Sequence, residues 1–351
     1  MDKKAKKFLF DLLNTDSPSG DEEAIQKVWI DYVKQFAKVS TDISGNATGC
    51  LNPGAEFKVM LAGHCDEIAM VVNKIDEKGF VRFSAVGGVF PMVLPGLRVE
   101  ILGYGGRISG IIGYARSKPD NKDKVKPCDE LYIDCGFNSD KQLKKLIRTG
   151  DYIVYRGAPE ILNNKMLVSK ALDNKTGAFI VAEVLRRLSN KKLKVGCYAV
   201  STTGEETNLR GAHFAGAAIQ PNMAIACDVT FNTDTPGENS DNRPEIEIGK
   251  GPALSTGSPI NNKIVKLLEK AAAKSKIALQ YELTPDRTYT DADRIMFSGK
   301  GVAVALVSLP VRYMHSPIEM TSLEDIEAVI SLLCQMITDL SGKEDLRPVV
   351  A

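Results

Sequence analysis

The sequence predicts an α/β fold in which helices flank a central sheet, interrupted by a small β-rich domain. In both terminal parts of the chain, strand-like apolar runs alternate with helical patterns, as in sheets covered by helices. Between about residues 70 and 165 this alternation gives way to short β-rich runs separated by Gly, Pro and charged turns, which is typical of a barrel or a sandwich. The length of 351 residues also favours two domains.

The first forty residues have a helical pattern. Ser19 and Glu22 have the spacing of a capping box, which predicts a helix start, and a short strand over residues 57–61 comes after the helical region. Apolar residues at spacings of three, four and seven form one stripe of this helix: Ile25, Val28, Trp29, Tyr32, Val33 and Phe36.

The middle of the chain is expected to be an inserted β-domain over residues 71–164, with residues 1–70 and 165–351 forming the other domain. Its only helical pattern lies at residues 141–147. Its predicted strands are short and separated by turn residues: 69–75, 80–84, 98–102, 107–112 and 152–155.

After residue 165 the alternation of helices and strands returns, and the chain ends in an amphipathic helix. A polar loop that contains glycine runs through Asn242. The predicted helices are 178–188, 260–271 and 323–337, and the predicted strands are 193–200, 223–227 and 302–309.

Composition excludes several classes of function. Forty-five basic residues against 44 acidic ones leave a formal charge of +1, so neither a nucleic-acid footprint nor a membrane-attracting surface is expected. No apolar run approaches the roughly 18–20 residues that span a bilayer, and the N-terminus lacks a signal-peptide pattern. The seven cysteines are odd in number and form no CxxC, as expected for free thiols in the cytoplasm.

Two adjacent carboxylates, Glu205 and Glu206, follow the predicted strand over residues 193–200 and a turn of small residues. Such a turn lies where α/β proteins bind their ligands. Neighbouring acids repel each other unless a cation or a shared proton offsets their charge. The pair is explained if one carboxylate binds a metal ion and its neighbour transfers protons. A solvated pair at a helix N-terminus, favoured by the macrodipole, is the alternative.

Histidines and carboxylates also stand at the boundaries of other predicted elements. Two imidazoles and three carboxylates form a mixed nitrogen and oxygen set that suits two divalent cations, with Zn, Co and Mn all compatible. A single aspartate at such a position is more often a helix cap, and His213, in a helix without a nearby carboxylate, is not expected to bind metal. The candidate ligands are His64, Asp173, Glu206, Asp228 and His315.

Seven segments resemble the signature segments of the tetrahedral (TET) and glutamyl aminopeptidase family, in the family's order and over roughly residues 15–340. Members of this family are metallopeptidases that use two metal ions to remove N-terminal residues from peptides. The segments are Gly63-His-Cys-Asp-Glu67, Ala171-Leu-Asp-Asn-Lys-Thr-Gly177, Thr203-Gly-Glu-Glu206, Leu209-Arg-Gly-Ala212, Gly249-Lys-Gly-Pro252, Thr290-Asp-Ala292 and Val311-Arg-Tyr-Met-His-Ser316.

The resemblance implies roles for individual residues. Asp173 would bridge two divalent metal ions in each subunit, and a cis peptide is expected between Asp173 and Asn174. Glu205 would be the general base, and Asp66 would orient the imidazole of His64. The remaining ligands divide between the two ions, with His64 and Asp228 on one and Glu206 and His315 on the other.

The resemblance also implies a fold and an assembly. It predicts a three-layer catalytic domain with a central mixed sheet, plus an inserted domain that resembles a β-barrel. It further implies a homo-oligomer, a dodecamer built from dimers, in which residues 71–164 serve oligomerisation and access to the active site.

The chain departs from the family pattern near the first ligand and at the bridging residue. Asn174 stands where the family usually has an acid, and Cys65 and Ala69 replace the more usual Met and Gly. Cys65 points away from His64 in an extended strand, so we expect it in the core. The family often has a histidine near Lys118-Pro-Asp120, and this chain has none there.

The leading hypothesis is an aminopeptidase that acts on short peptides. A metal-dependent deacylase of modified amino acids and a catalytically silent, self-assembling cage are the alternatives. An endoglucanase is disfavoured, because one Trp in 351 residues provides no evident aromatic platform for a sugar. The sequence does not decide whether the preferred N-terminal residue of the substrate is acidic, neutral or basic.

Overall fold

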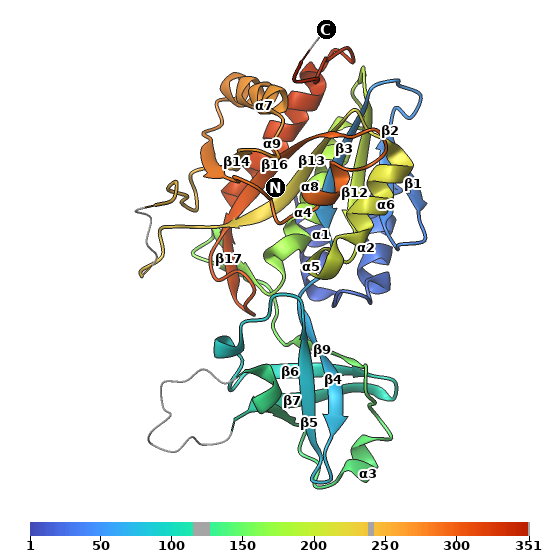
Figure 1. Cartoon of the computed structure of the whole chain (residues 1–351), viewed down its shortest axis with the longest axis vertical. Coiled ribbons are helices and arrows are strands. Elements are labelled where there is room, and N and C mark those ends of the chain that lie inside the picture. The colour runs from blue at the N-terminus through green and yellow to red at the C-terminus, as the bar shows by residue number, and fades with distance from the viewer. Residues whose placement is uncertain (115–126, 238–241, 350–351) are drawn as a thin grey trace.

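The computed structural model describes residues 1–114, 127–237 and 242–349. Figure 1 shows a large α/β part that holds both ends of the described chain, and a smaller β-rich part joined to it by two connections. Among the described helices, none combines the length and the apolarity that crossing a membrane requires.

The α/β part is built on a mixed sheet, as predicted. Its four central strands run parallel, and one antiparallel strand flanks this group at each of its two edges. Central strands such as β3 (Lys58–His64) and β13 (Met223–Phe231) are buried along nearly their whole length, which explains their continuous apolar sequence. In spatial order the strands are β1 (Lys38–Thr41), β2 (Ala47–Leu51), β12 (Gly196–Thr202), β3 (Lys58–His64), β13 (Met223–Phe231), β16 (Ala303–Val311), β14 (Ala253–Thr256) and β15 (Gln280–Leu283).

Helices cover both faces of this sheet (Figure 1). The helices are α1 (Lys3–Asn14), α2 (Glu23–Val33), α4 (Leu172–Leu188), α6 (Arg210–Ile219), α7 (Asn262–Ser275), α8 (Ala292–Ile295) and α9 (Leu323–Asp339). On one face, α4 packs on β3, β12 and β13 and also contacts α1, α2 and α9. On the other face, α6 contacts β3 and β12, and α8 contacts β13 and β16.

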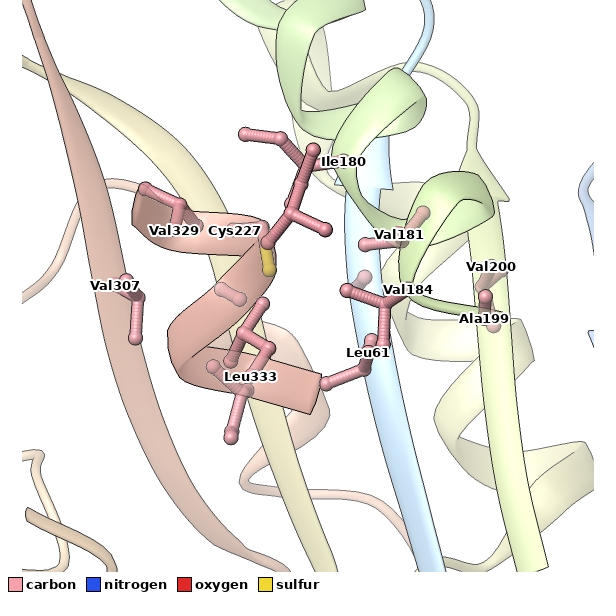
Figure 2. Packing of buried hydrophobic residues seen from close by; sticks show 14 of the residues in the cluster. Leu61, Ile180, Val181, Val184, Ala199, Val200, Cys227, Val307, Val329 and Leu333 are labelled. Carbon is pink, nitrogen blue, oxygen red and sulfur yellow. The ribbon is translucent and has the colours of Figure 1, made fainter. Parts of the chain in front are cut away.

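The main core lies between the sheet and the pair α4 and α9. Figure 2 shows Val184 of α4, Leu333 of α9 and Leu61 of β3 as members of this cluster. All three side chains are fully buried. This packing holds the carboxyl ends of the central strands in fixed positions, so side chains placed there inherit the rigidity of the sheet.

The β-rich part is a closed, fully antiparallel barrel rather than a sandwich. Its interior is a separate apolar cluster that includes Met70, Phe83 and Ile101. Helix α3 (Asp140–Leu143) and the short helices η1 (Pro91–Val93) and η3 (Cys128–Glu130) lie between its strands. In spatial order the strands are β4 (Ala69–Ile75), β5 (Phe80–Val86), β8 (Tyr132–Asp134), β7 (Gly106–Gly113), β6 (Arg98–Gly103) and β9 (Tyr152–Tyr155).

A buried ion network lies where the barrel joins the α/β part, and sequence reasoning missed it. Glu67, just before β4, accepts hydrogen bonds from Lys170 Nζ at 2.9 Å and from Lys175 Nζ at 2.8 Å. Lys170 also donates to Asp16 at 2.6 Å. Arg107 of the barrel reaches the same aspartate at 2.5 Å. The network therefore ties the N-terminal segment, the connection before β4, the start of α4 and the barrel together.

Two sequence predictions on local structure need correction. Ser19 and Glu22 form no capping box: Glu22 accepts hydrogen bonds from Gly20 N–H and from Arg210, and α2 begins at Glu23 without a side-chain cap. The helix predicted over residues 141–147 is only the single turn α3. A further sheet of β10 (Glu160–Leu162), β11 (Met166–Ser169) and β17 (Glu319–Ser322) was not predicted.

Candidate active site

The predicted ligands lie at or near the carboxyl ends of strands, on one side of the α/β part. His64 is the last residue of β3, Asp228 lies on β13, and His315 lies in the loop after β16. Glu205 and Glu206 begin the one-turn helix α5 (Glu205–Asn208) directly after β12. Because these strands run parallel, their carboxyl ends meet at one edge of the sheet.

The imidazole of His64 lies among three carboxylates. Its Nε2 atom is 3.1 Å from Asp173 Oδ1, 3.6 Å from Glu205 Oε2 and 3.9 Å from Asp228 Oδ1. Two groups of three residues each bring their ligand atoms within 4.8 Å of one another. The first group is His64, Glu205 and Asp228, and the second is His64, Asp173 and Glu206. The cluster therefore offers more than one position with the donor set of a divalent cation.

The second imidazole faces the other side of the same aspartate. His315 Nε2 is 3.2 Å from Asp173 Oδ2 and 3.6 Å from Glu206 Oε2. The two oxygens of Asp173 thus face different imidazoles. The expected cis peptide between Asp173 and Asn174 is present.

The cluster concentrates negative charge in a buried place. Burial, reinforced by neighbouring carboxylates, raises the pKa of Glu205, Glu206 and Asp228 well above the ordinary carboxyl range. Burial also opposes ionisation of Asp173, but the two imidazoles outweigh it and lower the pKa of that group.

One oxygen of this cluster has no partner. Among the described residues, Glu206 Oε1 is buried and receives no hydrogen bond. A buried carboxylate oxygen without a donor is costly, and a cation in contact with it would remove that cost. The charge surplus and this unpartnered oxygen both fit a site for divalent metal ions.

Asp66 contacts both glutamates and the imidazole of His64. Its two carboxylate oxygens accept the backbone N–H groups of Glu205 at 3.1 Å and of Glu206 at 3.2 Å. His64 Nδ1 lies 3.1 Å from the Asp66 backbone oxygen and 3.5 Å from its Oδ1. Asp66 therefore lies where it can orient the imidazole of His64 and hold the turn that carries both glutamates.

Sequence reasoning missed a matching carboxylate, Glu319, on the other side of the site. Glu319 is 2% exposed. Its Oε2 accepts the N–H of Asp173 at 3.0 Å, and its Oε1 accepts the N–H of His315 at 2.8 Å. It thus fixes the backbones of two candidate ligands at once. The only signal in the sequence is its position four residues after His315.

Asp291 is a second missed acid. It is buried, it accepts a hydrogen bond from the Thr202 hydroxyl, and its Oδ1 has no partner among the described residues. Burial raises its pKa to about 6. The segment Thr290-Asp-Ala292 was among those that carried the resemblance, but residue patterns alone assigned it no role.

Other sequence predictions concern residues beside the ligands. Cys65 is a buried free thiol in the main core, as expected. Asn174 donates to the Cys227 carbonyl at 2.8 Å and accepts Gly177 N–H at 2.9 Å, so its side chain is engaged by backbone. His213 lies exposed on α6. The segment Lys118-Pro-Asp120 lies outside the described residues.

A cavity of about 590 Å³ opens over the cluster. This volume lies in the range of pockets that hold small-molecule ligands. Besides the candidate ligands, it is lined by Phe231, Thr284, Arg287, Thr288, Tyr289 and Thr290, among others. The catalytic candidates therefore face a space that could hold one or two residues of a peptide.

Comparison with known proteins places the chain in a family. Residues 45–332 match the model of the M42 glutamyl aminopeptidase family. The lysyl aminopeptidase of Pyrococcus furiosus is 31% identical over 337 residues, which cover 94% of this chain and 95% of that protein.

Solved structures agree with this assignment. A TET aminopeptidase from a marine sediment archaeon of the Thaumarchaeota superposes with a TM-score of 0.92 at 28% identity, over 96% of each chain. The TET1 peptidase of Pyrococcus horikoshii, which can assemble into a tetrahedron or a large octahedral shell, gives a TM-score of 0.85 at 25% identity, over 96% of this chain and 100% of that one. The chain belongs to the M42 glutamyl aminopeptidase family, and it is a peptide hydrolase of the aminopeptidase type.

Proposed function

We propose that this metal-dependent aminopeptidase works with two divalent ions, Zn, Co or Mn, bridged by Asp173. Metal site 1 would consist of His64, Asp173 and Asp228. Metal site 2 would consist of Asp173, Glu206 and His315. Bound at these positions, the ions would activate a water molecule and polarise the scissile carbonyl.

The observation that carries this proposal is the position of Asp173. Its Oδ1 lies 3.1 Å from the imidazole of His64, and its Oδ2 lies 3.2 Å from the imidazole of His315. A carboxylate with one oxygen toward each of two imidazoles has the arrangement that a bridging ligand needs. The unpartnered Glu206 Oε1 is a further oxygen atom that could bind the ion of metal site 2.

We assign Glu205 as the general base. It lines the cavity beside the ligands, and Asp66 fixes its backbone. A general base is most effective when its pKa lies near the working pH, and burial raises the pKa of Glu205 in that direction. Glu205 would take the proton of the attacking water and deliver it to the leaving amine.

We further propose short peptides as substrates and a homo-oligomer, a dodecamer built from dimers, as the working form. The pocket size favours short substrates. The relative from P. horikoshii can assemble into a tetrahedron or a large octahedral shell. Residues 71–164, which include all but the first two residues of the barrel strands, would contribute to these contacts and to substrate access.

The proposal is tested with a panel of aminoacyl-p-nitroanilides, assayed after chelator treatment and after return of Zn, Co or Mn. We expect hydrolysis that the chelator abolishes and a metal restores. Hydrolysis of N-acyl amino acids in its place would favour the deacylase alternative. No hydrolysis of either class with any metal would favour the silent cage and would reject the enzyme assignment.

A further inference from the structure

The inserted barrel reaches the candidate active site through a turn that follows β5, Gly87–Gly88. A Cβ atom added to Gly88 would lie 2.4 Å from Nδ1 and 2.5 Å from Cε1 of His315. A Cβ added to Gly87 would lie 3.3 Å from the Cβ of Glu206. The turn therefore touches both residues that belong to metal site 2 alone.

The two imidazoles differ in what holds the nitrogen that faces away from the carboxylates. An imidazole that binds metal usually donates a hydrogen bond from its other nitrogen, which fixes the orientation of the ring. His64 has such a neighbour, because its Nδ1 lies 3.1 Å from the Asp66 backbone oxygen. Among the described residues, no hydrogen-bond partner faces His315 Nδ1, and Gly88 occupies that side of the ring.

Packing therefore takes the place of that hydrogen bond. The ring of Phe90, two residues further along the same segment, lies 5.9 Å from the imidazole of His315, between ring centroids, at an angle of 42°. The backbone of His315 has a φ of +62°, a conformation that side-chain-bearing residues adopt rarely. Glu319 accepts the backbone N–H of His315, so it holds the loop and not the ring.

We propose that the Gly87–Gly88 turn positions the His315 imidazole, so that the inserted barrel completes metal site 2. This inference rests on the proposed function for the identity of the ligands. Metal site 1 lies wholly within the α/β part. Displacing the barrel or filling the space at Gly88 would thus weaken binding of the second ion and leave the first unchanged.

The test is the Gly88→Ala variant, with Gly54→Ala as the matched control. Neither glycine has a left-handed φ, and a Cβ at Gly54 would meet nothing within 4 Å. Zn binding is measured by calorimetric titration of the metal-free full-length protein, with ion stoichiometry from elemental analysis. For Gly88→Ala we expect affinity for the second ion to fall about 10- to 100-fold, as for loss of a group that orients a ligand, with the first unchanged. Gly54→Ala should match the wild type.

A second variant separates positioning from folding. Phe90 is 43% exposed, so Phe90→Ala should leave the fold intact and weaken the second ion in the same direction, by less. If Gly88→Ala folds and binds both ions like the wild type, the inference is overturned. If Gly88→Ala fails to fold, unchanged second-ion affinity in Phe90→Ala overturns it. Because binding is measured without substrate, a wild type that binds two ions but hydrolyses nothing would reject the proposed function and spare this inference.

Discussion

The two halves of the candidate site are held by different means. His64 ends a central strand, its side chain is 1% exposed, and both ring nitrogens face polar partners. His315 lies in a loop at positive φ, with its side chain 23% exposed. The first half is part of one sheet and its packed helices. The second is assembled from a loop, the carboxylate of Glu319 and a turn of the inserted barrel, so it depends on the docking of separate parts.

The largest expected effect is on kcat, from a substitution that leaves both halves of the site in place. Glu205→Gln should keep metal binding and lose activity, with kcat lower by about 100- to 10,000-fold, the usual contribution of a general base. Steady-state kinetics with a good p-nitroanilide substrate measure this loss. The exposed Glu23→Gln serves as control. Activity near that of the wild type in Glu205→Gln would reject Glu205 as the base.

The next largest effect concerns the junction that docks the barrel. Glu67→Gln leaves the buried amines of Lys170 and Lys175 without their shared carboxylate. Removing one partner of a buried ion pair typically costs about 3–5 kcal/mol of the free energy of unfolding. Urea unfolding at neutral pH measures the difference. A loss below about 1 kcal/mol would show that the network does not stabilise the junction.

The same substitution has a defined pH dependence. Burial opposes the charge on Glu67, but Lys170 and Lys175 outweigh it and hold its pKa at about 2, below the ordinary value of 4.5. Its stabilising contribution is therefore fully present above pH 4.5 and is lost as the pH falls toward 2. The stability difference between wild type and Glu67→Gln should shrink across this window. A difference that stays constant would contradict this assignment.

A smaller effect is expected at the carboxylate that supports the second half. Glu319→Gln replaces one of two acceptors, so it weakens the hold on the backbone of Asp173 or His315. Second-ion affinity and kcat should both fall about 10- to 100-fold. Glu324→Gln, whose side chain is 65% exposed, is the control. Equal behaviour of the two variants would remove Glu319 from the site.

The smallest expected effect is a difference in ion affinity between the two metal sites of the unaltered protein. In a graded chelator titration, the ion of metal site 2 should leave first, at about tenfold lower chelator concentration than the ion of metal site 1, taking the lower end of the usual effect of ligand orientation. Elemental analysis of the desalted protein follows the number of ions. Simultaneous loss of both ions would show that the halves are equally firm.

Much of the first half could be predicted from the sequence. His64 and Asp228 follow apolar runs that are buried strands, so the pattern placed both at sheet ends. The supports of the second half carried little signal in the sequence. Glu319 lies only four residues after His315, but on a short strand without an apolar run. Gly88 meets His315 from the inserted barrel, which is distant in sequence. The capping-box prediction failed for a similar reason, because Arg210, distant in sequence, takes the carboxylate of Glu22.

The central claim is that Asp173 bridges two ions, and a crystal structure of the Zn-loaded protein with anomalous diffraction tests it most directly. We expect two anomalous peaks about 3.5–4 Å apart, one beside each oxygen of Asp173, with His64 on one ion and His315 on the other. A single peak, or two peaks of which only one contacts Asp173, would contradict it.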